Sequence, residues 1–123
     1  MIAYFASDLI WATRIKSAAE AMSIPARPVR TVEMLEARLA DSDVRGLIVD
    51  LDHPDIALPL IERVRRGGGS ESGRGGSAIR VAAFGPHVET EVLQRAKEAG
   101  ADLVLTRGAF HHGMSEVLRR LNE

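Results

Sequence analysis

The stretch Val44-Arg-Gly-Leu-Ile-Val-Asp-Leu-Asp-His-Pro54 contains a short, nearly continuous apolar run that ends in carboxylates. Such a run is typical of a strand that helices cover on both faces. Patterns of helical period precede and follow it, and this alternation is the signature of a parallel sheet. We therefore predict a central strand over residues 44–51, with Asp50 at its carboxyl end.

Four further apolar runs cover residues 1–6, 24–30, 79–84 and 103–105, and a segment of helical period follows each of the five runs. Pro25 and Pro28 fall in the second run. Because proline cannot donate to a central ladder, this strand is expected at an edge of the sheet. The pattern predicts an α/β fold, a (βα)5 doubly wound parallel sheet of the flavodoxin-like type with strand order 2-1-3-4-5.

The helical segments carry start and stop signals. Ser7 or Asp8 is positioned to cap the first helix, and Thr31 to cap the second. Gly100 is expected to end the fourth. The apolar residues of the first helix recur at spacings of three and four and are predicted to form one buried stripe: Leu9, Ile10, Ala12, Ile15, Ala18, Ala19 and Met22.

Length and composition limit the classes of function. The 123 residues suit a single domain over residues 1–123. The 16 basic and 17 acidic residues lack the basic excess that nucleic-acid binding requires. With no cysteine and no apolar run of the ~20 residues of a membrane span, we expect a cytoplasmic protein without membrane contact. Residues 67–77 are mainly Gly and Ser and are expected to be a flexible surface loop.

The order of strands locates a candidate site. Ligands of doubly wound sheets bind beyond the carboxyl ends of the strands, near the switch between strands one and three. Polar or small residues are predicted to gather at this edge: Ser7, Asp8, Asp50, Asp52, His53, Gly85, His87, Thr106 and Arg107.

Two motifs resemble the receiver domains of two-component response regulators, and the resemblance covers essentially the whole chain. Ala99-Gly-Ala-Asp-Leu-Val-Leu-Thr-Arg107 is similar to the stretch that leads into the family's invariant lysine. Asp50-Leu-Asp-His-Pro54 is similar to the surroundings of the family's phosphoacceptor aspartate. The resemblance implies a receiver-like fold with Asp50 at the phosphoacceptor position.

The chain departs from the family at the other working positions, and the resemblance therefore implies a degenerate receiver. Where the family has a magnesium-binding acidic pair, a hydroxyl residue, an aromatic residue and a lysine, this chain has Ala6 with Ser7, Phe84 or Gly85, Val104 and Arg107. We predict a vestigial phosphoacceptor pocket of Ser7, Asp8, Asp50, Phe84, Gly85 and Arg107. In it, Asp50 either pairs with Arg107 or is a hydrogen-bonded carboxylate at the strand end. Asp52 is expected to cap or turn toward the third helix.

The resemblance also implies a partner surface on the fourth helix and fifth strand, with Val104, Thr106, Phe110 and Met114 nearby. A protein partner or a homodimer contact is expected there. Trp11, with Arg14 one turn later, is either an exposed interaction residue or part of the core.

No metal or cofactor is expected. The histidines at 53, 87, 111 and 112 all follow strand ends, but their spacing matches no zinc pattern. The glycines of residues 67–77 follow a helix, whereas a phosphate-binding loop follows a strand, and no Gly-x-Gly-x-x-Gly follows the first strand.

These observations predict a non-catalytic, receiver-like domain (a pseudo-receiver) that acts through protein–protein contacts in bacterial-type signalling and is not an enzyme. Two alternatives stay open. The first is an atypical phosphoaccepting receiver that uses Asp50, with Asp8 as a metal ligand. The second is a flavodoxin-like small-molecule binder with its pocket between Ser7, Asp50 and Gly85.

Overall fold

Five strands alternate with five helices in the part of the chain that the structure describes. The computed structural model describes residues 1–66, 79–86 and 88–123. The strands are β1 (Ile2–Phe5), β2 (Ala26–Pro28), β3 (Gly46–Asp50), β4 (Arg80–Gly85) and β5 (Leu103–Thr106). The helices are α1 (Leu9–Ala21), α2 (Val32–Asp41), α3 (Pro54–Arg66), α4 (Thr90–Ala99) and α5 (Arg107–Leu121). The predicted loop at 67–77 lies outside the described residues.

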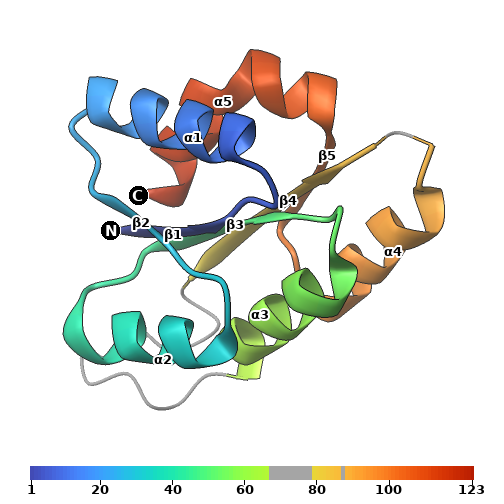
Figure 1. Cartoon of the computed structure of the whole chain (residues 1–123), viewed down its shortest axis with the longest axis horizontal. Coiled ribbons are helices and arrows are strands. Elements are labelled where there is room, and N and C mark those ends of the chain that lie inside the picture. Colours follow the sequence, from blue (N-terminus) through green and yellow to red (C-terminus); the bar gives the residue numbers. More distant parts are fainter. Residues whose placement is uncertain (67–78, 87) are drawn as a thin grey trace.

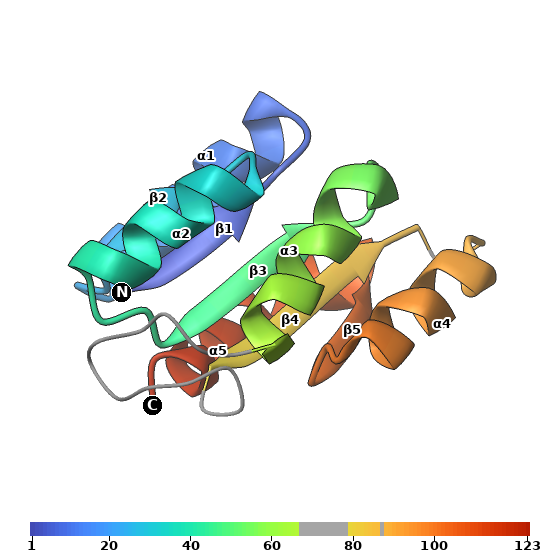
Figure 2. The ribbon, with the colours of Figure 1, turned by 90° about the horizontal axis from the view of Figure 1, so that it is seen from below.

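The strands form one parallel sheet in the order β2-β1-β3-β4-β5. Helices α1 and α5 cover one face, and α2, α3 and α4 cover the other (Figure 1). Figure 2 shows the second face, with these three helices in front of the sheet and running roughly along the strands. The predicted doubly wound fold, its strand order and the edge position of the proline-bearing strand are confirmed.

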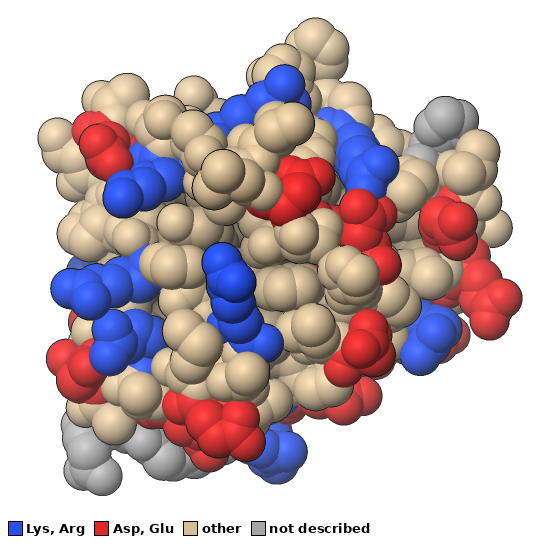
Figure 3. Space-filling view, in the orientation of Figure 1, with Lys and Arg blue, Asp and Glu red and all other residues tan. Residues whose placement is uncertain are grey.

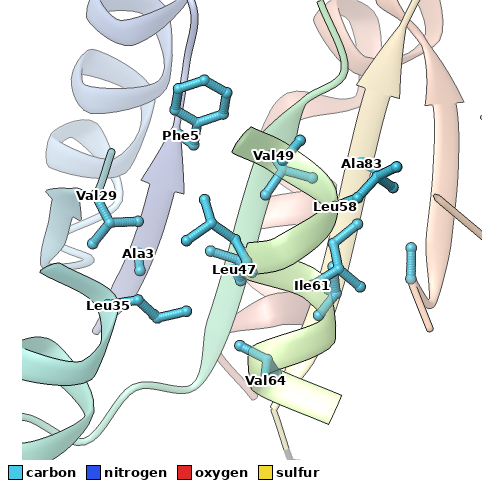
Figure 4. Close-up of a cluster of buried hydrophobic side chains, with 14 of the residues drawn as sticks. Ala3, Phe5, Val29, Leu35, Leu47, Val49, Leu58, Ile61, Val64 and Ala83 are labelled. Carbon is cyan, nitrogen blue, oxygen red and sulfur yellow. The ribbon is translucent and has the colours of Figure 1, made fainter. Parts of the chain in front are cut away.

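Two apolar cores hold the layers together because successive strand residues point to opposite faces. Leu47 and Val49 of β3 pack toward α2 and α3, where Leu35 and Ile61 are also fully buried (Figure 4). Ile48, between them in sequence, packs in the other core, which contains residues of α1 and α5. β3 is buried along its whole length and is the central strand of the sheet, as predicted.

The predicted helix signals act as expected. Asp8 caps α1 by accepting from the Trp11 amide at 2.9 Å, and Thr31 caps α2. Gly100 ends α4 with a φ of 118°, in the left-handed region that glycine adopts without strain. No helix in the described ranges is both long and apolar enough to span a bilayer.

The predicted stripe of α1 is wrong at its first two residues. Leu9 is 80% exposed and Ile10 is 63% exposed, whereas Trp11, Ile15 and Ala19 are buried. Each residue turns the helix by about 100°, so Leu9 and Ile10 lie off the arc centred on Ile15. Two large apolar side chains are consequently left on the surface where α1 begins.

Candidate functional site

The carboxylate of Asp50 is the centre of the candidate site. Asp50 ends β3 and is fully buried. Its Oδ2 accepts from the Ser7 amide at 3.0 Å and from Ser7 Oγ at 2.5 Å, and its Oδ1 accepts from the Asp52 amide at 3.0 Å. A buried carboxylate is costly unless donors satisfy it. These three donors satisfy Asp50 and join the end of β1 to the end of β3.

Local sequence places each donor. Ser7 lies in the two-residue gap between the end of β1 and the Asp8 cap of α1, so its amide is not used by the sheet or the helix. Asp52 follows β3 by two residues, and its amide turns back to the strand's last carboxylate. The predicted hydrogen-bonded carboxylate at the strand end is therefore the arrangement found.

The predicted ion pair between Asp50 and Arg107 is wrong. Arg107, the first residue of α5, pairs with Asp52. Asp50 is buried and turned toward β1, whereas Asp52 lies beyond the strand end and is partly exposed. The Asp52 carboxylate contacts Arg107 of α5, and Ser7 Oγ lies 3.5 Å from its Oδ2. The site therefore consists of successive contacts: Arg107 pairs with Asp52, Asp52 lies near Ser7, and Ser7 donates to Asp50.

Phe84 and Gly85, the residues at the end of β4, are buried. Phe84 stacks on Phe110, with ring centroids 4.3 Å apart and planes at 11°. The Trp11 ring lies against both of these rings, with its centroid 5.0 Å from that of Phe84 and 5.8 Å from that of Phe110. This aromatic cluster of Trp11, Phe84 and Phe110 fills the space between β4, α1 and α5. Phe84 thus belongs to the core, contrary to the prediction that placed it in the pocket.

Two of the four residues expected near the partner surface, Phe110 and Met114, are buried, at 0% and 7% exposure, and do not belong to it. For Trp11, which is 8% exposed, the core reading is the one found. Helix α5 begins at Arg107, and its first turn already packs on the sheet, which carries Phe110 inward. Val104 and Thr106 are half-buried, and Thr106 caps α5. The Cζ atom of Arg14 lies 5.1 Å from the centroid of the Trp11 ring. The two side chains are therefore in contact at the edge of the core.

The carboxylates near Asp50 do not fit a magnesium site of the receiver type. Mg²⁺ needs hard oxygen ligands in octahedral geometry. Asp50 accepts three hydrogen bonds, Asp52 forms an ion pair and Asp8 caps α1. Ala6 and Ser7, which follow β1, supply no carboxylate. Within residues 1–66, 79–86 and 88–123, no three His, Cys, Asp or Glu side chains are grouped to hold a metal ion.

Histidines lie at the same edge of the sheet without forming a cluster. His53 follows β3, and His111 and His112 are in the first turns of α5 with ring centroids 5.5 Å apart. His111 also meets Trp11 edge-on at 6.4 Å. His87 lies outside the described residues.

A groove of about 300 Å³ opens at the carboxyl end of β1. We call it the α1 groove, and its lining residues are Phe5, Ala6, Ser7, Asp8, Leu9, Ala12, Arg30, His53 and Ile56. Ser7 was predicted at this edge, whereas Asp50 and Gly85 are buried and do not line the groove. Sequence reasoning missed Leu9 and Arg30; the Asp8 cap was the signal that would have placed Leu9 in an exposed first turn.

A second hollow of about 280 Å³ lies at the opposite end of the sheet, beside Arg80, Leu103 and Glu123. Arg80 donates to the Arg120 carbonyl at 2.6 Å and to the Glu123 carboxylate at 2.8 Å. The hydrogen bond from Arg80 lowers the pKa of the Glu123 carboxyl. Arg80 and Glu123 of this hollow are thus engaged with each other.

The charged side chains on the face shown in Figure 3 are mixed in sign. Basic and acidic residues are interspersed there, and no extended area of positive charge is visible. A surface that binds nucleic acid needs a basic patch or stripe. This face does not provide one.

The fold, although not the sequence, resembles known proteins. No family model matches the chain, and no curated protein matches it. The receiver domain of NtrX from Brucella abortus superposes with a TM-score of 0.77 at 13% identity, over 98% of this chain and 97% of that one. The chemotaxis response regulator CheY4 of Vibrio cholerae superposes with a TM-score of 0.74 at 12% identity, over 98% of this chain and 96% of that one.

A response regulator from Thermotoga maritima gives a TM-score of 0.73 at 17% identity, over 98% of this chain and 94% of that one. The coverage is nearly complete in both directions for all three structures. The predicted receiver-like fold is therefore confirmed. At these identities the likeness concerns the fold alone.

Proposed function

We propose that this chain is a receiver-fold signalling domain that does not accept a phosphoryl group and that acts through contact with a protein partner. The solved structures that share its fold are response regulators and receiver domains. A shared fold does not fix the chemistry, so the role has to be argued from the site itself. The observation that carries the proposal is the buried Asp50 carboxylate, whose two oxygens are held by Ser7 and the Asp52 amide.

The chemistry of phosphoryl transfer supports the proposal. The acceptor needs a free carboxylate oxygen, and the charge on the transferring group needs a positioned cation. Asp50 has its carboxylate buried, and Arg107 is paired with Asp52. Phe84, at the end of β4, offers an aromatic ring instead of a hydrogen-bond donor. The site therefore serves to fix the strand ends.

Phosphodonor labelling tests the proposal. The full chain is incubated with acetyl phosphate and Mg²⁺, and the intact mass is recorded. We expect no phosphoryl adduct, because Asp50 is not accessible and no acidic pair holds the metal. An active receiver treated in parallel confirms that the donor works. An adduct that forms on the wild type and is absent from Asp50→Asn would show that Asp50 accepts a phosphoryl group, and it would contradict the proposal.

A further inference from the structure

The α1 groove takes no part in holding Asp50, apart from sharing Ser7. Its wall on one side is α1, where Leu9 is 80% exposed and Ala12 is half-buried. Its other wall includes Ile56 in the first turn of α3. Apolar side chains thus face the groove from both sides, and the Leu9 side chain is almost wholly in water. A partner that covers Leu9 removes this apolar area from water, which favours binding.

The charge in the α1 groove is uneven. Arg30 is exposed and has no ion-pair partner in the described part of the chain. Asp8, the only acidic side chain of the lining, accepts from the Trp11 amide and lies at the positive end of the α1 dipole. The cap and the helix dipole partly offset its charge. Arg30 has no such local partner among the described residues, so a carboxylate on the occupant is favoured beside it.

The shape of the α1 groove favours a chain segment over a small molecule. Pockets for small molecules enclose most of their ligand. Here Asp8, Leu9, Arg30 and His53 are all exposed, so the groove is open along its rim. A volume of about 300 Å³ is enough for a few side chains of a segment that continues beyond both ends.

We infer that the α1 groove binds a segment of a partner protein that sets a large apolar side chain against Leu9 and Ile56 and a carboxylate against Arg30. The inference rests on the protein-contact part of the proposed function and specifies the partner as acidic and apolar. It moves the contact from the predicted surface of the fourth helix and fifth strand to the start of α1. The imidazole of His53, on the rim, can donate a further hydrogen bond.

Selection from a library of random displayed peptides tests this inference on the full chain. We expect enriched peptides with Asp or Glu close to a large apolar residue. Leu9→Ser should weaken their binding at least tenfold. Arg30→Glu reverses the charge of the groove, and selection on this variant should enrich Lys or Arg in place of the acidic residue.

Arg27→Glu is the matched control, because Arg27 is exposed on β2 and does not line the α1 groove. It should select the same acidic peptides as the wild type. Unchanged melting temperatures show that each variant is folded. The inference is overturned if no peptides are enriched, if they carry no acidic residue, or if they bind Leu9→Ser and Arg30→Glu as well as the wild type. Phosphodonor labelling is read separately, so a failure here leaves the statement about Asp50 in place.

Discussion

Asp50→Asn is expected to lower the free energy of unfolding by about 2 kcal/mol. Three donors, two from Ser7 and one from the Asp52 amide, converge on the two carboxylate oxygens of Asp50. An Asn side chain has one oxygen and one NH₂ group, so at least one buried donor then faces another donor. Urea unfolding of both proteins, monitored by circular dichroism, measures the difference.

The sign of this change in the free energy of unfolding distinguishes a structural Asp50 from an Asp50 that belongs to a working acidic cluster. In a working acidic cluster, like charges repel, so removing one of them favours the folded state. Here Asp50 is held by hydrogen bonds, and removing its charge destabilises the fold. Asp52→Asn is the control, because Asp52 is partly exposed and its pair with Arg107 should contribute at most about 1 kcal/mol. An Asp50→Asn protein as stable as the wild type, or more stable, would contradict a structural role for the carboxylate.

Phe84→Ala is expected to lower the free energy of unfolding by about 4 kcal/mol. Phe84 is fully buried between Trp11 and Phe110, and its removal leaves a cavity between the sheet, α1 and α5. Trp11 is the only tryptophan of the chain. Its fluorescence should therefore shift to longer wavelength as water enters beside the ring, and the same signal follows unfolding.

Val88→Ala is the control for the aromatic cluster. Val88 is 71% exposed, so the loss of its methyl groups should change stability by less than about 0.5 kcal/mol. Trp11 fluorescence should stay that of the wild type. If Phe84→Ala were as mild as Val88→Ala, the cluster would not be a main support of the packing of α1 and α5 on the sheet.

Local sequence signals predicted the elements of the fold well. Pro25 and Pro28 act through the missing backbone donor of proline, which is a local property. The run 44–51 indicates a buried strand by its own apolar composition. The caps at Asp8, Thr31 and Gly100 are local in the same sense, and each is found where the sequence placed it.

The contacts within the site could not be predicted to the same degree. Asp50 and Asp52 are only two residues apart in the sequence. Asp50 is buried and Asp52 pairs with Arg107 because β3 ends inside the protein at Asp50, whereas Asp52 lies beyond the strand end and is partly exposed. Phe110 and Met114 looked available because the resemblance assigned their region to partner contacts. Their burial depends on how α5 packs on the sheet, which is a property of the tertiary fold.

The choice between a structural and a phosphoaccepting Asp50 is tested most directly by amide NMR of the full chain, titrated with Mg²⁺ and then with Mg²⁺ plus beryllofluoride, a mimic of the acyl phosphate. We predict that the amide signals of Ser7, Asp50, Asp52 and Arg107 do not move, because the Asp50 oxygens are already occupied by hydrogen bonds. Saturable shifts that centre on Asp50 and spread into α4 and β5 would contradict the account.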